Sequence, residues 1–500
     1  MKEQQAKVII VGSGFAGLGM AIQLKKAGWH DFIVLERGDD VGGAWRENHY
    51  PGCACDVESL LYSFSFEPKH DWSRKFAPSA EIHQYLRHCA RKYDIYPHIH
   101  FSRSLVSAEF DEGNARWQLR DSDGRHYNSQ FLVSALGPLS NPIIPDLDGL
   151  DNFDGPAFHS AQWDHSVDLK DKHVAIVGSG ASTIQFLPKV AEQAKSVTLF
   201  QRTAPWVMPK LDRPFSRREQ LMFKWLPGFQ KLWRGMIYWR AELFLKAYLN
   251  TDSWLHRYGE KQIRRYIDAV ISDPQLREKI TPKFSLGCKR TLLSNDYYPA
   301  LMRDNVSVVD AGVEQISSRG VIAANQQEYP ADAILFGTGF RVDDPLSGVT
   351  VKGLDGRDLG KEWQGNAFSS YYGTTVSGYP NMLILAGPNT GIGHTSLVYM
   401  IEQQISYAIK YLKKVDSIDG AYLDVLPDAQ QRFHDKLQQQ FPGTVWAAGC
   451  ESWYLTEGKK NFSIWPTFTY RYAKEVRQLR LSDYRLCSVA GVNGSEVLAR

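Results

Sequence analysis

The feature that most constrains this chain is a glycine-rich turn that occurs twice in the sequence. The first copy, Gly12-Ser13-Gly14-Phe15-Ala16-Gly17, follows the apolar run 7–11 and precedes a helical pattern over 18–26 and a second apolar run, 32–36. Glycines there permit a tight turn and let a pyrophosphate approach the amino end of the helix. Glu36 lies 24 residues after Gly12, where a carboxylate can accept hydrogen bonds from ribose hydroxyls. This spacing predicts a strand–helix–strand unit that binds a dinucleotide.

A second copy, Gly178-Ser179-Gly180-Ala181-Ser182-Thr183, lies between the apolar runs 174–177 and 197–200. It differs from the first copy in two ways. Thr183 replaces the third glycine, so we expect the helix and the strand to pack less closely there. The second run ends in Gln201-Arg202-Thr203, without an acidic residue. An arginine at this place favours the 2′-phosphate of NADP, although Arg202 is also compatible with a solvated strand end.

Each unit closes with a further apolar run and a glycine, and these features set the predicted fold class. The closing runs are 131–137 and 334–339, and a late strand, 382–386, is expected to rejoin the first sheet before a long helix, about 396–413. The fold class is α/β, with two Rossmann-like dinucleotide-binding domains. The predicted domains are 1–145 with 380–500 for the first and 171–340 for the second, with 146–170 as a linker and 341–379 as the return linker.

The second unit is longer than the first, and the extra length falls between about 205 and 273. Aromatic side chains there alternate with cations at helical spacing: Phe223, Trp225, Phe229, Trp233, Trp239 and Phe244 with Lys224, Lys231, Arg234, Arg240 and Lys246. The spacing predicts a helical insertion in the second domain. We expect the aromatic side chains to be packed inside, since aromatic stripes are usually buried. A face toward a membrane surface or a lipid substrate is the alternative.

The composition excludes several classes of function. A net charge of +3 is too small to indicate nucleic-acid binding, but it is compatible with a local phosphate pocket. The amino terminus has no apolar region typical of a secretory signal, and no apolar run reaches transmembrane length. The six cysteines show neither metal-ligand nor Cys-x-x-Cys spacing, so we expect reduced thiols, a cytoplasmic location and no metal site.

Three further stretches carry residues typical of a reactive site. The stretch 42–56 contains two adjacent glycines, which allow the backbone to approach a flat ring system closely, and it ends in Asp56. The stretch 153–164 carries His159 and follows two prolines, which indicates a linker rather than a regular element. Lys289 and Arg290 are adjacent cations. Each of these stretches also has a structural interpretation. The first is typical of a structural loop, His159 of a capping histidine, and the adjacent cations of a surface turn.

Taken together, these residues resemble the flavin-dependent Baeyer–Villiger monooxygenases, within the flavin-containing monooxygenase superfamily. The resemblance extends over nearly the whole chain, from about 7 to 471. Its two most specific patterns are Phe153-x-Gly155-x-x-x-His159-x-x-x-Trp163-Asp164 and Gly43-x-Trp45-x-x-x-x-Tyr50-Pro51-Gly52-x-x-x-Asp56. Two such patterns in a chain with paired nucleotide motifs favour a site over the structural interpretations given above.

The resemblance implies FAD in the first domain and NADPH in the second. Residues that would contact FAD are Gly12, Ser13, Gly14, Phe15, Ala16, Gly17, Glu36, Arg37, Gly43, Ala44, Trp45, Asp56, Tyr62, Val106 and Leu397. Residues that would bind NADP are Gly178, Ser179, Gly180, Ala181, Ser182, Thr183, Arg202, Thr203 and Lys289. The implied catalytic residues are Arg290, which would face the flavin, Asp56, which would pair with it, and His159, which would couple the linker to domain movement. Trp453 would lie near the nicotinamide ribose and the substrate.

The sequence departs from the family pattern at three places. Thr183 replaces a small third residue, Ala54 stands where many members carry arginine, and Cys53-Ala54-Cys55-Asp56 sets the chain apart as a less characterised subgroup. The substrate range of other members is therefore not carried over to this chain.

The implied activity consumes NADPH and inserts one oxygen atom from O₂ next to a ketone carbonyl, giving an ester or lactone through a C4a-peroxyflavin. Arg290 would stabilise the peroxide and then the oxyanion of the adduct. Three alternatives stay open: a flavin monooxygenase that oxidises sulfur or nitrogen, an NADPH-dependent flavoprotein reductase or oxidase, and a non-catalytic nucleotide-sensing protein. A reductase would need a Cys-x-x-Cys pair, which the sequence lacks. The expected partners are O₂ and a small apolar ketone or sulfide, with no nucleic acid; peripheral membrane contact and the oligomeric state stay open.

Overall fold

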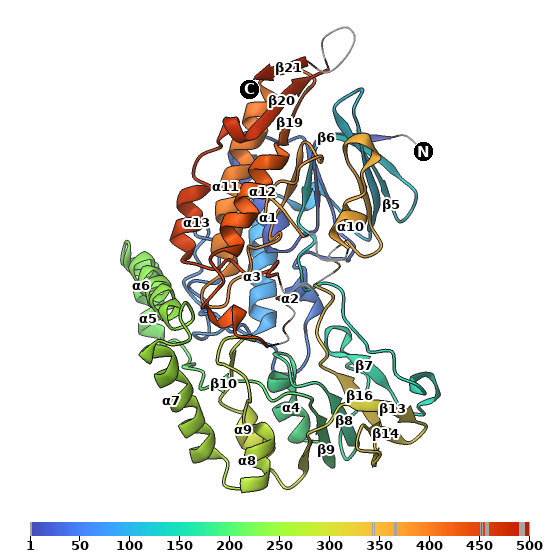
Figure 1. Cartoon of the computed structure of the whole chain (residues 1–500), viewed down its shortest axis with the longest axis vertical. Helices are drawn as coiled ribbons and strands as arrows, with labels where there is room; N and C mark the ends of the chain where they lie inside the picture. The colour runs from blue at the N-terminus through green and yellow to red at the C-terminus, as the bar shows by residue number, and fades with distance from the viewer. Residues whose placement is uncertain are drawn as a thin grey trace.

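Two large sheets organise the molecule, the first mixed and the second all parallel, and one glycine-rich turn follows a strand of each (Figure 1). The computed structural model describes residues 3–342, 344, 346–364, 368–450, 452, 454–455, 460–489 and 496–499. Figure 1 shows the first sheet with α1 and α11 in the upper part of the molecule and the second sheet with α4 in the lower part. This arrangement agrees with the predicted α/β class.

The first sheet has the strand order β17-β4-β5-β6-β1-β2-β3, with β18 paired to β6. Its strands are β1 (Gln4–Val11), β2 (Phe32–Leu35), β3 (Ile99–His100), β4 (Leu105–Asp111), β5 (Arg116–Asp121), β6 (His126–Ser134), β17 (Thr350–Lys352) and β18 (Met382–Ile384). β1 lies between β2 and β6, parallel to both, and Val8 to Val11 are buried, which explains its continuous apolar run. The parallel pairing of β18 with β6 confirms that the late strand rejoins the first sheet.

The second sheet has the strand order β12-β9-β8-β16-β7, and its pairs are all parallel. Its strands are β7 (Ala157–His159), β8 (His173–Val177), β9 (Ser196–Phe200), β12 (Val306–Val309) and β16 (Ala333–Phe336). β7 lies in the stretch for which the sequence indicates no regular element, and that expectation is wrong for these three residues. Such a short edge strand shows no periodicity of its own, because its partner β16 comes about 175 residues later along the chain.

The helices cover these sheets and extend beyond them. They are α1 (Phe15–Lys26), α2 (Ala44–Glu47), α3 (Ser79–Lys92), α4 (Thr183–Ala191), α5 (Arg217–Trp225), α6 (Phe229–Phe244), α7 (Trp254–Val270), α8 (Pro274–Ile280), α9 (Tyr297–Leu301), α10 (Leu359–Trp363), α11 (Leu397–Asp416), α12 (Pro427–Gln438) and α13 (Thr469–Glu475). α1 packs against α11 and is buried on nearly every side, so its sequence is apolar rather than amphipathic.

Smaller elements connect these layers. Three further groups of strands are β10 (Val207–Met208) with β11 (Leu292–Leu293); β13 (Val313–Ser317) with β14 (Gly320–Ala323) and β15 (Glu328–Pro330); and β19 (Ala421–Val425) with β20 (Tyr484–Ser488) and β21 (Glu496–Ala499). Short 3₁₀ helices span Tyr96–His98, Leu150–Asn152, Ser160–Gln162, Leu245–Ala247, Leu354–Gly356, Val445–Ala447 and Leu481–Asp483.

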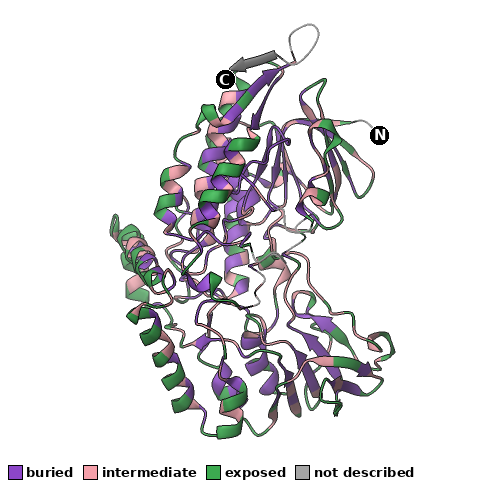
Figure 2. Ribbon diagram, in the orientation of Figure 1, coloured by how far each residue is buried: buried purple, intermediate pink, exposed green. Residues whose placement is uncertain are grey.

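The segment 205–273 contains α5, α6 and α7, and its aromatic side chains divide between two environments. Phe223 is buried, but Trp225, Trp239 and Phe244 are exposed by 68%, 54% and 43%. The expectation that these aromatic residues pack inside is therefore wrong for three of them. Figure 2 shows the exposed residues along α6 and α7 at the edge of the molecule. In the described part of the chain, no helix is both long and apolar enough to cross a bilayer.

Two of the six cysteines are paired, which corrects the expectation of reduced thiols. Cys288 and Cys450 form a disulfide with a Cα–Cα distance of 6.2 Å, across 162 residues of sequence. Cys53, Cys55, Cys89 and Cys487 are free and buried. The disulfide fastens the chain just before Arg290 to the region that follows α12.

Candidate active site

The first glycine-rich turn has almost no space for side chains. Gly12 has φ +101°, and a Cβ there would lie 2.6 Å from the carbonyl oxygen of Ala135. A Cβ on Gly17 would overlap the carbonyl oxygen of Gly12. Gly43, from the stretch 42–56, approaches so closely that a Cβ on it would lie 3.0 Å from the Cα of Gly14. The turn and this stretch therefore form one continuous backbone surface of the kind that a flat dinucleotide cofactor requires.

Glu36 is fixed at the carboxyl end of β2, directly beside this turn. Its carboxylate accepts hydrogen bonds from the Ser13 amide at 2.8 Å, from the Ser13 hydroxyl at 2.6 Å and from the Gly38 amide at 2.8 Å. The side chain is buried. The predicted ribose-binding carboxylate is therefore held by the turn itself.

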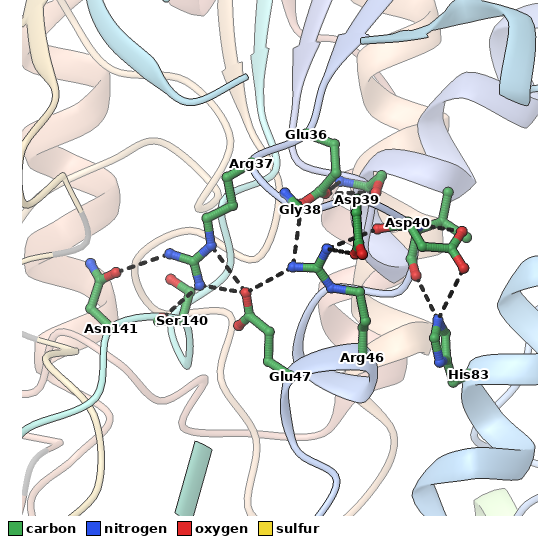
Figure 3. A network of polar contacts seen from close by, with 12 residues as sticks. Glu36, Arg37, Gly38, Asp39, Asp40, Arg46, Glu47, His83, Ser140 and Asn141 are labelled. Atoms are coloured by element: carbon green, nitrogen blue, oxygen red, sulfur yellow. Dashed lines mark hydrogen bonds and ion pairs between the residues drawn. The ribbon is translucent and has the colours of Figure 1, made fainter. Parts of the chain in front are cut away.

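Two arginines extend the network around Glu36 (Figure 3). Arg37 donates to Glu47 at 2.6 Å and to the Ser140 carbonyl at 2.8 Å, so it ties the end of β2 to the chain that leaves β6. Arg46 lies directly over Gly38 and donates to Asp39 at 3.2 Å. Arg46 belongs to no predicted site, because nothing in its spacing distinguishes it from a surface cation.

The second glycine-rich turn repeats this geometry with one change. Gly178 has φ +95°, and a Cβ there would lie 2.7 Å from the carbonyl oxygen of Gly337. Thr183, in place of a third glycine, is buried, and its hydroxyl occupies the space that a Cβ on Gly337 would need. Arg202 and Thr203 are exposed at the end of β9, where the Thr203 carbonyl accepts a hydrogen bond of 3.0 Å from the Ser179 hydroxyl.

Asp56 and Arg290 form an ion pair. Arg290 donates to one oxygen of Asp56 from Nε at 3.0 Å and from Nη2 at 2.6 Å. About a third of the Arg290 side chain and a quarter of the Asp56 side chain remain accessible. These residues are 234 positions apart, so the fold alone brings them together.

Electrostatics keep this pair ionised. The charge of Asp56 raises the pKa of Arg290, against the opposing effect of burial. Burial alone would raise the pKa of Asp56, but the charge and hydrogen bonds of Arg290 lower it below its usual range. Both contacts use the Nε–Nη2 edge of the guanidinium. The Nη1 side is directed away from Asp56 and presents a permanent positive charge to any group that approaches it.

Aromatic side chains form one wall beside this pair. The indole N–H of Trp45 donates to the hydroxyl of Tyr62 at 3.2 Å, and the two rings meet edge to face at 5.4 Å. Phe15, from the first turn, packs edge to face on Tyr62 at 5.2 Å. The structure thus brings together the predicted flavin contacts Phe15, Trp45 and Tyr62.

Lys210 is a site residue that sequence analysis missed. Burial lowers its pKa, and the nearby Asp212, Cys55 and Asp56 oppose this effect. Lys210 follows β10, which pairs with β11, the strand that begins two residues after Arg290. No motif marks it, and only the pairing of two two-residue strands brings it toward Asp56.

Gln185 of α4 joins the stretch 42–56 to the second unit. Its amide oxygen accepts hydrogen bonds from the Tyr50 hydroxyl at 2.9 Å and the Ala54 amide at 3.3 Å, and its amide nitrogen donates to the Ala54 carbonyl at 3.0 Å. A Cβ on Gly52 would lie 2.7 Å from the Gln185 carbonyl oxygen. The backbone of Ala54 is therefore part of the contact between the two units.

His159 lies at the end of β7, in the second sheet. It is fully buried, its Nδ1 accepts a hydrogen bond of 3.1 Å from the Ala161 amide, and its ring meets Phe340 edge to face. Burial lowers its pKa to about 4, so the ring is neutral near pH 7. His159 therefore packs β7 against the segment that follows β16. Asp56 and Arg290 form the charged pair of the candidate site.

The remaining predicted residues lie in several elements, and one of them is outside the described chain. Leu397 begins α11 and lines an apolar cavity together with Leu136, Trp363 and Phe462. Val106 lies in β4 at an irregularity in its pairing with β5. Lys289 lies over the ring of Phe284 at 5.3 Å. Trp453 is outside the described residues.

Comparisons with known proteins agree with this geometry. Residues 9–216 match a family described as pyridine nucleotide-disulphide oxidoreductase. A Baeyer–Villiger monooxygenase of Pseudomonas aeruginosa is 43% identical over 97% of this chain and 92% of its own length, and one of Streptomyces coelicolor is 42% identical over 97% and 93%. The crystal structure of OTEMO in complex with FAD and NADP superimposes with a TM-score of 0.86 at 25% identity, over 97% of this chain and 100% of that one.

Proposed function

The chain belongs to the Baeyer–Villiger monooxygenases, and on that premise we propose that it inserts one oxygen atom of O₂ next to the carbonyl group of an apolar ketone. The product is an ester or lactone. The second oxygen atom leaves as water, and NADPH is the reductant. The family membership supports the reaction class, and the pairing of Asp56 with Arg290 carries the assignment of the reactive centre.

The two glycine-rich turns fit the two cofactors of this reaction, FAD and NADPH. At the first turn, the approach of Gly43 to Gly14 leaves a side-chain-free surface beside the fixed carboxylate of Glu36, as FAD requires. At the second turn, exposed Arg202 supplies a cation where the 2′-phosphate of NADPH would lie. When bound, FAD would supply the redox chemistry that takes electrons from NADPH and activates O₂.

Arg290 gives the site its chemical specificity. A carbonyl carbon under nucleophilic attack places negative charge on its oxygen, and a fixed guanidinium stabilises that charge without reorganisation. Asp56 holds the guanidinium by its Nε–Nη2 edge and keeps it ionised, so the Nη1 side is available to the developing oxyanion. Lys210 adds a second cation near Asp56. Trp45, Tyr62 and Phe15 exclude water on one side.

Oxidation of a sulfide is the second candidate activity. A sulfide needs no stabilised oxyanion, so sulfoxidation depends less on the guanidinium of Arg290 than ester formation does. We propose an apolar ketone as the main substrate and the cytoplasm, where NADPH is regenerated, as the compartment.

Product analysis with labelled oxygen tests the proposal. The FAD-loaded protein is supplied with NADPH, ¹⁸O₂ and a panel of cyclic and linear ketones, and esters are analysed by mass spectrometry. We expect one ¹⁸O atom per ester. Arg290→Ala should lower ester formation by about 100- to 1000-fold, the effect typical of removing an oxyanion donor. Exposed Arg120 in β5 supplies the matched control, Arg120→Ala, which should leave the rate unchanged.

The outcomes separate the alternatives. Sulfoxide from a thioether but no ester from any ketone would assign the protein to sulfur oxidation. Hydrogen peroxide released in the amount of NADPH consumed, with no oxygenated product, would contradict the monooxygenase proposal. Full ester formation by Arg290→Ala would remove Arg290 from the mechanism and leave the reaction class in place.

A further inference from the structure

The outer side of the helical insertion exposes large apolar side chains. We define the insertion surface by six of them: Trp225 at the end of α5; Leu232, Met236, Trp239 and Leu243 on α6; and Trp254 at the start of α7. Each is exposed by at least 50%, and the two outer tryptophans by 68%. Figure 2 shows how far α6 and α7 stand out from the body of the molecule. Such a concentration of exposed apolar side chains marks an interaction surface.

α6 carries apolar side chains on two faces, and only one of them packs against the body. Leu232, Met236, Trp239 and Leu243 follow the spacing i, i+4, i+7, i+11 and therefore share one exposed face. The opposite side packs Ile237, Trp233 and Tyr238 against the body, and Arg234 there donates to the Leu60 carbonyl at 2.7 Å. One apolar face of α6 is therefore covered by the body, as an amphipathic helix requires, and the second stays exposed among the described residues.

Charge indicates the kind of partner. The range 217–265 contains eleven lysines and arginines but four aspartates and glutamates, a net charge of +7 within a chain of net +3. Two acids and two arginines of this range have ion-pair partners outside it, so the excess of cations remains: Glu219 pairs with Arg213, Glu242 with His394, Arg234 with Glu402 and Arg240 with Glu58. Lys224, Lys231 and Arg257 are exposed among the apolar residues. Apolar side chains rimmed by cations are complementary to an anionic, apolar-cored surface.

We propose that the insertion surface binds an anionic lipid bilayer, with α6 lying along the membrane interface. Tryptophan is the residue preferred at that depth, and the surrounding cations would meet the lipid phosphates. A second copy of the chain is a poorer occupant. A two-fold interface would set the same positively charged surface against itself, and like charges in contact oppose association. The binding of lipid does not depend on the proposed oxygenation, so each stands or fails alone.

Vesicle flotation with the FAD-loaded chain tests the proposal. We expect the protein to float with vesicles of phosphatidylcholine mixed with phosphatidylglycerol, to bind pure phosphatidylcholine weakly, and to be released by salt. The double variant Trp239→Ser, Leu243→Ser removes apolar contact, and Lys224→Glu, Lys231→Glu reverses two charges. Each should weaken binding by at least about 10-fold, given roughly 1 kcal/mol per basic residue near an anionic surface.

Matched variants elsewhere on the surface supply the controls. Leu481→Ser changes an equally apolar residue that is 41% exposed, and Lys361→Glu reverses an exposed charge on α10. Both should bind vesicles as the parent does. Every variant should retain FAD and its rate with a water-soluble ketone, which shows that the fold is intact.

Two outcomes would overturn the proposal. One is the absence of binding to the anionic vesicles, or binding that neither double variant weakens. The other is a dimer, seen by analytical ultracentrifugation, that Trp239→Ser, Leu243→Ser converts to a monomer. That result would assign the insertion surface to a second copy of the chain.

Discussion

The two glycine-rich turns of this chain solve the same steric problem with different residues. In both turns, the first glycine has a positive φ. It lies against a backbone carbonyl oxygen just after the neighbouring strand, which is β6 in the first sheet and β16 in the second. For Gly12 the oxygen belongs to Ala135, and a Cβ would lie 2.6 Å away; for Gly178 it belongs to Gly337, at 2.7 Å. The shared geometry explains why both turns begin with glycine.

The turns differ at their sixth position. Gly17 lies against Gly12, so in the first unit the turn itself requires the missing side chain. Thr183 has a side chain, and its hydroxyl fits because Gly337 has none. In the first unit the glycine must be in the turn, at Gly17. In the second unit it must follow the closing strand, at Gly337. A departure from a motif is therefore interpretable only together with the residue that packs against it.

The largest effect is expected from Gly17→Ala. It adds a side chain at the sixth position of the first turn, where the second turn already has Thr183. The new Cβ would overlap a backbone oxygen that cannot move independently, so we expect a loss of at least about 3 kcal/mol in the free energy of unfolding. The protein should also purify without FAD, as visible absorbance would show. Gly180→Ala is the matched control, because its Cβ would lie 3.5 Å from the nearest atom. Full FAD content in Gly17→Ala would contradict this comparison.

Acid should weaken the second unit more than the first, because burial lowers the pKa of His159 in β7 further than that of His100 in β3 of the first sheet. The pKa of His159 is about 4 in the folded chain and about 6.5 when unfolded, so the unfolded state takes up the proton first as the pH falls. Stability contributed through this group is complete above pH 6.5 and falls by about 3 kcal/mol by pH 4. Hydrogen exchange should show β7 and β16 opening earlier than β1 and β6.

Replacement of the titrating group tests this assignment. His159→Gln should flatten the pH dependence of exchange in β7 and β16, whatever its effect on stability at neutral pH. Equal acid sensitivity of both sheets in the parent chain would remove His159 as the cause.

Local patterns in the sequence predicted the repeated parts of the molecule. Apolar runs next to glycine-rich turns marked β1, β2, β8 and β9, because strand burial and turn geometry are properties of neighbouring residues. The meeting of Asp56 with Arg290 was predicted through the family resemblance, since their 234-residue separation carries no local signal. The assigned cofactor contacts stay predictions until a cofactor complex is measured.

What the sequence did not predict depends on partners distant along the chain. β7 could not be predicted, because only its pairing with β16 defines it as a strand. Lys210 comes near Asp56 only through the pairing of β10 with β11. The disulfide joins Cys288 to Cys450 across 162 residues, and spacing rules address only nearby cysteines. The exposure of Trp239 departs from the usual burial of aromatic residues, because the spacing of α6 does not show which of its two apolar faces packs against the body.

A smaller effect is expected when the compensating glycine of the second unit is changed. Gly337→Ala places a Cβ on the hydroxyl of Thr183 and should destabilise the chain by about 2 kcal/mol. The double variant Gly337→Ala, Thr183→Ala removes the obstructing hydroxyl and should recover most of that loss. Thermal unfolding of both variants and of Thr183→Ala completes a double-mutant cycle. Additive effects in that cycle would show that the two residues do not compensate each other.

The smallest effect concerns the ends of the strands that follow the two turns, β2 and β9. Glu36 is engaged by Ser13 and Gly38, whereas Arg202 is exposed beside Thr203, so the second unit should discriminate between cofactors by charge. Arg202→Ala should raise the KM for NADPH by about 10-fold, or about 1.4 kcal/mol, and leave the KM for NADH unchanged. Lys195→Ala, an exposed cation just before the amino end of β9, is the control and should change neither value. A rise in both KM values for Arg202→Ala would place Arg202 on the pyrophosphate that the two cofactors share. The contrast between the units would then lie in their packing alone, since both would bind the cofactor by the same chemistry.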